Sequence, residues 1–158
     1  MDARGTEVVR TVIEIEEADP GVMLEFERLG DEAFDAICAE LQSDRLTPQQ
    51  QVNALRSLGR LTRQQCFDRK ETALEEALRL TESTSQIARS GGVNAAIWAT
   101  LSLERFPERA SRPENRPGAK PSLRQRVQQV VRRAVERGLD AEQDKFARRF
   151  LNDLPPEE

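Results

Sequence analysis

Residues 29–61 read LGDEAFDAICAELQSDRLTPQQQVNALRSLGRL, and this stretch decides the fold. Its apolar residues recur every three or four positions, which is the period of one buried face of an α-helix. Between the two apolar runs, Thr47 and Pro48 form a helix N-cap pattern, with Gln50 placed for a capping box. The stretch therefore predicts two helices joined by a short turn. The positions that set the period are Phe34, Ile37, Cys38 and Leu41, then Val52, Leu55 and Leu58.

The same pair of helices recurs further along the chain, which indicates an internal repeat. The offset is 40 residues for the first helix and 41 for the second. A two-helix unit with this period predicts a stacked array, because each pair buries its apolar face against the next pair. The corresponding positions are Phe34, Ile37 and Cys38 with Leu74, Ala77 and Leu78, and Val52, Asn53 and Ala54 with Val93, Asn94 and Ala95.

This unit resembles the HEAT-repeat family, well over residues 29–103 and loosely over 122–154. The resemblance implies an all-α fold, a short right-handed α-solenoid of about three HEAT-like helix pairs with an N-terminal helical extension. An unrelated all-α bundle is the alternative. The family often has an arginine in the second helix, where this chain has Asn53 and Asn94. The resemblance is carried by Leu29-Gly30-Asp31-Glu32-Ala33, Ile37 and Leu41, then by Val52-Asn53-Ala54-Leu55 and Leu58-Gly59-Arg60-Leu61.

We expect one domain, residues 1–158. Residues 6–16 are rich in β-branched side chains, which favour strands, but Val8, Val12 and Ile15 fit one helical face and a lone strand would lack a partner. We therefore predict a helix there, followed by another that Asp19 caps. The expected domain has four parts: acidic N-terminal helices over 1–28, the two clearest repeats over 29–106, a Pro- and Arg-rich loop over 107–121 and a C-terminal helix pair over 122–154.

The glycines are expected to mark boundaries. Gly30, Gly59 and Gly138 fall at or near predicted helix ends. Gly91 and Gly92 have the pattern of a bend between helices, and they lack the flanking residues of a phosphate-binding loop.

The net charge of −4 conceals a strong asymmetry along the chain. Residues 1–44 carry a net charge of −10, whereas residues 105–149 carry +7. Opposite charge at the two ends can steer association with a partner, or with a second copy head to tail. Solvated helix faces are the alternative interpretation. The acidic candidates for contact with a basic partner are Glu16, Glu17, Asp31 and Glu32.

Two arginine stripes have helical spacing. Such stripes suit phosphates or an acidic protein surface, and pairing with carboxylates of neighbouring helices is the structural alternative. The stripes are Arg56, Arg60 and Arg63, then Arg126, Arg133 and Arg137.

The predicted helix over 93–106 is apolar on nearly all sides, with Trp98 at an edge. Such a helix is normally buried, and we expect internal burial here. If its open side is instead exposed for a partner, Trp98 is the natural anchor.

Several function classes are excluded by what is absent. The chain has no histidine, which excludes Ser-His-Asp catalysis and His-ligated zinc. Cys38 and Cys66 have no metal-site spacing, and the acidic residues follow no EF-hand pattern. We therefore expect no catalytic residues, no cofactor and no metal. The longest uncharged run, 90–103, is too short to span a bilayer, and no signal segment opens the chain, so we expect a cytoplasmic protein.

These observations favour a non-enzymatic protein–protein interaction module, an adaptor or regulatory subunit that uses a charge-polarised solenoid surface. One alternative is nucleic-acid binding through residues 105–149, since HEAT-like DNA glycosylases hold a duplex, although their catalytic residues have no counterpart here. Another is a HEAT-type lyase or chaperone-like enzyme, since the chain also looks like the phycobilin lyases of that type, although no chromophore-handling motif is recognisable.

Overall fold

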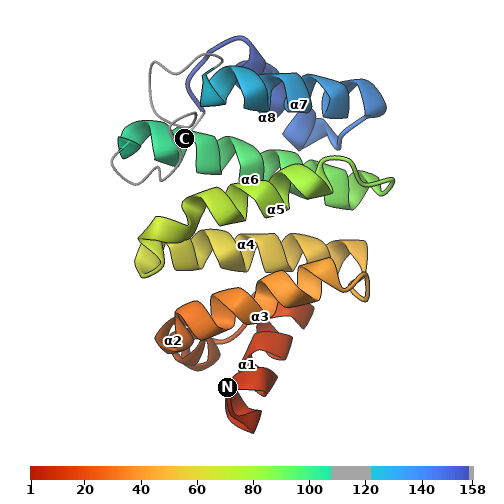
Figure 1. Ribbon diagram of the computed structural model, residues 1–158. Helices are drawn as coiled ribbons and strands as arrows, with labels where there is room; N and C mark the ends of the chain where they lie inside the picture. Colours follow the sequence, from red (N-terminus) through yellow and green to blue (C-terminus); the bar gives the residue numbers. More distant parts are fainter. Residues whose placement is uncertain (108–121, 157–158) are drawn as a thin grey trace.

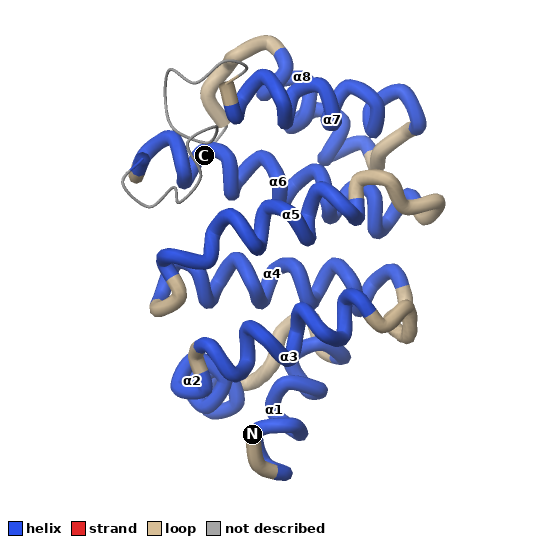
Figure 2. The backbone as a smooth tube through the Cα atoms, viewed as in Figure 1, coloured by secondary structure: helices blue, strands red, loops and turns tan. Residues whose placement is uncertain are grey.

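The computed structural model describes residues 1–107 and 122–156, and within them the chain is helical with no strand (Figures 1 and 2). The all-α prediction is confirmed. The elements are α1 (Ala3–Glu14), α2 (Pro20–Leu29), α3 (Asp31–Gln42), α4 (Pro48–Gln64), the 3₁₀ turn η1 (Phe67–Arg69), α5 (Lys70–Leu80), α6 (Gln86–Arg105), α7 (Leu123–Arg137) and α8 (Ala141–Leu151).

The predicted helix starts have the expected capping chemistry. Asp19 accepts hydrogen bonds from the backbone N–H groups of Gly21 and Val22 at the start of α2. Thr47 and Gln50 form a reciprocal capping box at the start of α4. Each device satisfies backbone donors that the first turn of a helix leaves unpaired. The β-branched segment near the N-terminus is helical as far as Glu14, as α1, but Ile15, which was predicted to lie on its apolar face, ends the helix in an extended conformation and is exposed.

The glycine predictions are partly wrong. Gly30 and Gly138 end α2 and α7 with positive φ angles of 54° and 103°, which glycine adopts without steric cost. Gly59, however, lies inside α4, five residues before its end. A single glycine destabilises a helix by only about 1 kcal/mol, and the packing of α4 against its neighbours offsets this.

The prediction of a bend at Gly91 and Gly92 is wrong, because α6 is continuous through both. A Cβ atom at position 92 would lie 2.7 Å from the backbone N of Thr81 and 2.9 Å from the carbonyl O of Ala77. A Cβ atom at position 91 would lie 2.6 Å from Cγ2 of Val52. The two glycines therefore permit α6 to approach both α5 and α4 closely.

The helices follow one another in space in chain order (Figure 1). Helix α4 packs against α1 on one side and α6 on the other, and α6 in turn packs against α8. Helices α4 and α6 run in the same direction (Figure 1). The interior between the helices is filled by Phe26, Phe34, Ile37, Leu58, Leu61, Ile97 and Leu103, all fully buried.

A buried arginine joins α7 and α8 to the rest of the protein. Arg89 of α6 donates hydrogen bonds to the carbonyl oxygens of Gly138 at 2.8 Å and Ser83 at 2.9 Å. It also reaches the carbonyls of Thr84 at 3.4 Å and Arg137 at 3.3 Å. Its guanidinium therefore bonds carbonyl groups in two turns, the one before α6 and the one between α7 and α8, which lie about fifty residues apart in the sequence.

The predicted loop over 107–121 lies outside the described residues except for Pro107.

Candidate functional site

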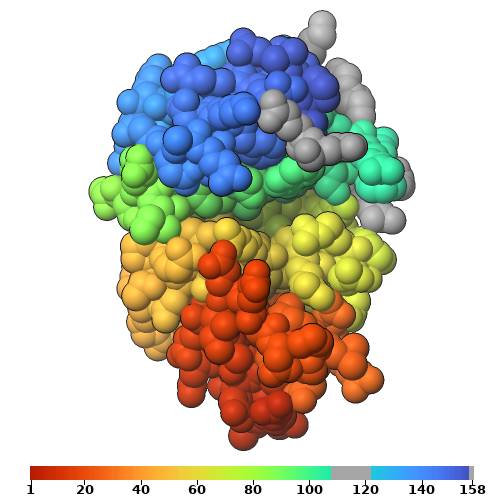
Figure 3. Space-filling model, turned by 180° about the vertical axis from the view of Figure 1, so that it is seen from behind, coloured from red at the N-terminus to blue at the C-terminus, as the bar shows by residue number. Residues whose placement is uncertain are grey.

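A long groove runs between α4 and α6 on the face shown in Figure 3, where the surface is hollowed between the two helices. It has a volume of about 1490 Å³. The connection between α1 and α2, from Ile15 to Ala18, forms part of its wall, and Asp140 and Gln143 near the start of α8 also line it. We call this space the α4–α6 groove.

Large apolar side chains are exposed along this groove. The exposed fractions are 49% for Ile15, 38% for Phe67, 54% for Ile87 and 47% for Trp98. They come from three parts of the chain, Ile15 from the α1–α2 connection, Phe67 from η1, and Ile87 and Trp98 from α6, and all four line the α4–α6 groove. An apolar patch assembled in a concavity is typical of an interaction site, whereas scattered exposed apolar residues are not.

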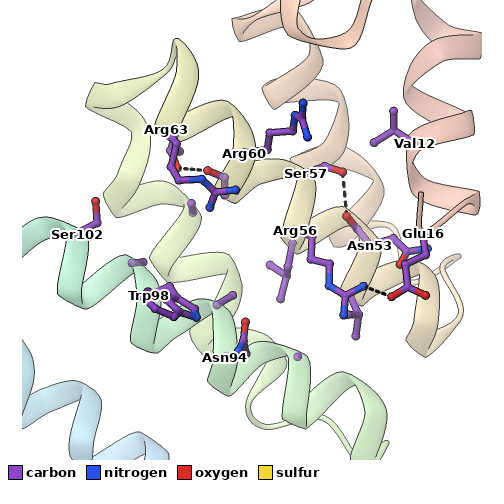
Figure 4. Close-up of a pocket in the computed structure, with 18 of the residues that line it drawn as sticks. Val12, Glu16, Asn53, Arg56, Ser57, Arg60, Arg63, Asn94, Trp98 and Ser102 are labelled. Carbon is purple, nitrogen blue, oxygen red and sulfur yellow. Dashed lines mark hydrogen bonds and ion pairs between the residues drawn. The ribbon is translucent and has the colours of Figure 1, made fainter. Parts of the chain in front are cut away.

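The expected burial of the helix over 93–106 is therefore only partly correct. Val93, Ile97 and Leu103 are fully buried, but Trp98 is half-exposed. The Trp98 ring stacks on Phe146 of α8, with ring centroids 5.5 Å apart and an angle of 27° between the planes. This contact orients the indole, which lines the groove near its centre (Figure 4).

The arginine stripe of α4 lines the groove, but its three members differ in their partners. Arg56 forms a 2.7 Å ion pair with Glu16, and Arg60 forms one of 2.7 Å with Glu27 of α2. The structural alternative is therefore correct for these two, which tie α4 to the acidic N-terminal helices. Arg63 is exposed and has no ion-pair partner within the described part of the chain.

The C-terminal ends of α4 and α6 make one end of the groove cationic. Arg63 of α4 and Arg105 of α6 line it there, and Lys70, the first residue of α5, joins them with Ser102 and Phe106. Lys70 is buried, donates a hydrogen bond to Oγ of Ser102, and holds its Nζ 5.1 Å from the centre of the Phe106 ring. Cations are favoured at helix C-termini, where the last carbonyl groups leave partial negative charge.

The arginine stripe of α7 does not contribute to the groove. Arg137 donates a 2.8 Å hydrogen bond to the carbonyl of Glu82, which gives it a structural role beside Arg89. Arg133 is exposed and Arg126 half-buried, and neither lines the groove. The two stripes therefore do not form one surface.

The four acidic candidates do not lie together in the structure. Glu16 and Glu17 line the groove. Asp31 instead lies 3.5 Å from Arg69, and Glu32 lies 3.9 Å from the amino group of Met1. The structure thus brings together Trp98, Arg56, Arg60, Arg63, Glu16 and Glu17 among the residues predicted as contacts.

Sequence reasoning missed Ile15, Phe67, Ile87, Lys70, Ser102 and Arg105 as groove residues. Ile87 was missed because the glycine pair suggested that the helix starts after it. Phe67 has a signal that could have been used, since a large aromatic residue in a short connection has few neighbours to bury it.

No other chemistry is evident among the described residues. They hold no group of three or more metal-ligating side chains, and none of their helices is long and apolar enough to cross a membrane. The groove offers apolar contact, cations and hydrogen-bond donors, which are the elements of a binding surface.

The two thiols are expected to react slowly. Burial raises the pKa of Cys38 to about 11 and the pKa of Cys66 to about 11. Since only the thiolate attacks a disulfide reagent, labelling at pH 8 should be about 10- to 100-fold slower in the folded protein than in urea, where thiols return to a pKa of about 8.5. The folded rate should then rise about tenfold per pH unit. Equal rates in the folded and unfolded protein would contradict this.

Compared with protein-family models, curated proteins and solved structures, the chain has no significant match.

Proposed function

We propose that this protein is a non-enzymatic protein–protein interaction module, an adaptor or regulatory subunit, whose docking surface is the α4–α6 groove. The observation that carries the proposal is the gathering of Ile15, Phe67, Ile87 and Trp98, all exposed, in one concavity. Aromatic and aliphatic side chains in a concave, partly cationic site are typical anchors of protein interfaces. Exposing them costs solubility, and a partner that covers them removes that cost.

As part of the same proposal, we assign the helices to a short right-handed HEAT-like α-solenoid. The proposed pairs are α3 with α4, α5 with α6, and α7 with α8; the first two follow the 40-residue period, and the third begins after residues 107–121. In the family the arginine of the second helix bonds an aspartate, but here asparagines replace it. Asn53 donates a 2.9 Å hydrogen bond to the carbonyl of Ile13, and Asn94 donates a 3.0 Å one to Oε1 of Gln143. Each asparagine thus joins a second helix of a pair to a neighbouring element.

Site-specific photo-crosslinking tests the docking surface. A benzophenone amino acid at position 98 in the groove should form covalent protein adducts in a lysate of the source cells, because a docked partner lies against the indole. The same amino acid at position 133, exposed on α7 and outside the groove, is the matched control and should form few adducts. Equal protein adduct yields at the two positions would contradict the assignment. Adducts that nuclease removes would favour nucleic-acid binding instead.

A further inference from the structure

Two arginines of the α4–α6 groove have no carboxylate partner in the described chain. Arg63 on α4 and Arg105 on α6 are both exposed and both line the groove. Arg105 packs its guanidinium 5.4 Å from the centre of the Phe106 ring. Arg56 and Arg60, by contrast, are paired with Glu16 and Glu27. The exposed cationic charge without a carboxylate partner in the groove therefore belongs to Arg63 and Arg105, since Lys70 is buried.

These two charges lie at one end of the groove. Figure 4 shows Arg63 across the groove from Trp98, Ser102 to the left of Trp98, and Arg56 with Glu16 to the right. Since α4 and α6 run in the same direction, their C-terminal residues Arg63 and Arg105 come to the same end (Figure 1). The groove therefore has an apolar section around Ile87 and Trp98 and a cationic end. A matching occupant should carry apolar side chains along its length and negative charge at one end.

The walls of the groove favour a helical occupant. Apart from the α1–α2 connection, Phe106 and Asp140, they are formed by helices, whose backbone groups are paired within each helix, and the lining residues include no sheet edge to which an extended backbone could bond. A helix satisfies its own backbone hydrogen bonds and presents only side chains. From Ile87 to Arg105 the groove follows α6 for about 27 Å, the length of a helix of about 18 residues.

We propose, on the basis of the proposed docking function, that the α4–α6 groove binds an acidic amphipathic helix of a partner protein. The apolar face of that helix covers Trp98 and Ile87. Its carboxylates are clustered at one end and pair with Arg63 and Arg105.

Trp98 supplies the measurement, because it is the only tryptophan and the chain has no tyrosine. Its emission is followed during titration with three synthetic 18-residue helices that lack tryptophan and tyrosine. The first has an apolar face and glutamates at one end, the second has lysines in place of those glutamates, and the third has the acidic composition without a continuous apolar face. The acidic amphipathic helix should shift the emission to shorter wavelength and bind at least ~10-fold more tightly than the other two at 50 mM salt. Its affinity should fall about tenfold at 500 mM salt.

Matched charge reversals localise the contact. The double variant Arg63→Glu, Arg105→Glu should weaken binding of the acidic helix at least ~10-fold. The double variant Arg132→Glu, Arg133→Glu makes the same charge change on α7, outside the groove, and should alter the affinity less than about twofold. An unchanged urea midpoint in both variants shows that the fold is intact.

Three outcomes would overturn the proposal. Tighter binding of the lysine helix would show that the groove is not selective for carboxylates, while the docking function would stand. No response to any helix at millimolar concentration would exclude a helical occupant, and the crosslink from position 98 would then decide the docking function separately. A Trp98 emission that shifts with protein concentration alone, with dimers in sedimentation, would identify a second copy as the occupant.

Discussion

Replacing Arg89 with methionine is expected to lower the free energy of unfolding by about 3–5 kcal/mol, because a hydrogen bond from a charged donor contributes about 1.5–3 kcal/mol and two of its four bonds are short. Arg89 is buried and serves four carbonyl oxygens, two of them at distances of 2.8 and 2.9 Å. Methionine fills much of the same space and removes every one of these donors. The measurement is urea unfolding followed by circular dichroism and by the emission of Trp98.

Two further variants separate the hydrogen bonds from the charge. Arg89→Lys keeps the charge but cannot reach both turns, so we expect a loss of about 1–2 kcal/mol. Arg133→Met removes an exposed arginine of α7 and should change stability by less than about 0.5 kcal/mol. If Arg89→Met lowered the free energy of unfolding no more than Arg133→Met, the hydrogen bonds of Arg89 would not stabilise the attachment of α7 and α8 to the rest of the protein.

Replacing Gly92 with alanine is expected to lower the free energy of unfolding by about 2–4 kcal/mol, since overpacking a core by one methyl group typically costs about 1–3 kcal/mol and the obstructing atoms here are backbone. The new Cβ would meet the N of Thr81 at 2.7 Å and the O of Ala77 at 2.9 Å. Neither atom can move without displacing α5. Thermal unfolding of the two proteins side by side measures the difference.

The control is Gly59→Ala within α4. There the new Cβ would meet only the end of the Arg63 side chain, at 3.4 Å. Alanine is the better helix former, so this variant should gain about 0.5–1 kcal/mol. Replacing glycine with alanine is thus expected to lower the free energy of unfolding at position 92 and to raise it at position 59. A gain in stability at position 92 would show that α5 and α6 are not in the close contact described.

The starts of α2 and α4 were predictable from sequence because the capping groups and the N–H groups they serve lie within one turn of each other. Asp19 and Thr47 need only the next three residues to act as caps. The same holds for the apolar period that locates the buried faces, which is why Phe34 and Ile37 were correctly placed in the core.

The composition of the groove was not predictable to the same degree. The stripe of Arg56, Arg60 and Arg63 has one spacing and one chemistry, yet two members are paired and one is not. What separates them is the position of Glu16 and Glu27, which lie 40 and 33 residues away in the chain from their partners. Helical spacing places side chains on one face, but it says nothing about which acids lie opposite.

The sequence by itself determined that this protein is all-α, where α2 and α4 start, and that the apolar faces of two helix pairs recur with a 40-residue period, because helix type, caps and apolar faces depend on interactions within a few turns. Only the tertiary structure decided that Gly91 and Gly92 lie inside a continuous helix, and that Trp98 lines an open groove with Ile15, Phe67 and Ile87. The physical reason is that exposure and close approach are properties of a side chain's neighbours, and those neighbours come from helices distant in the chain.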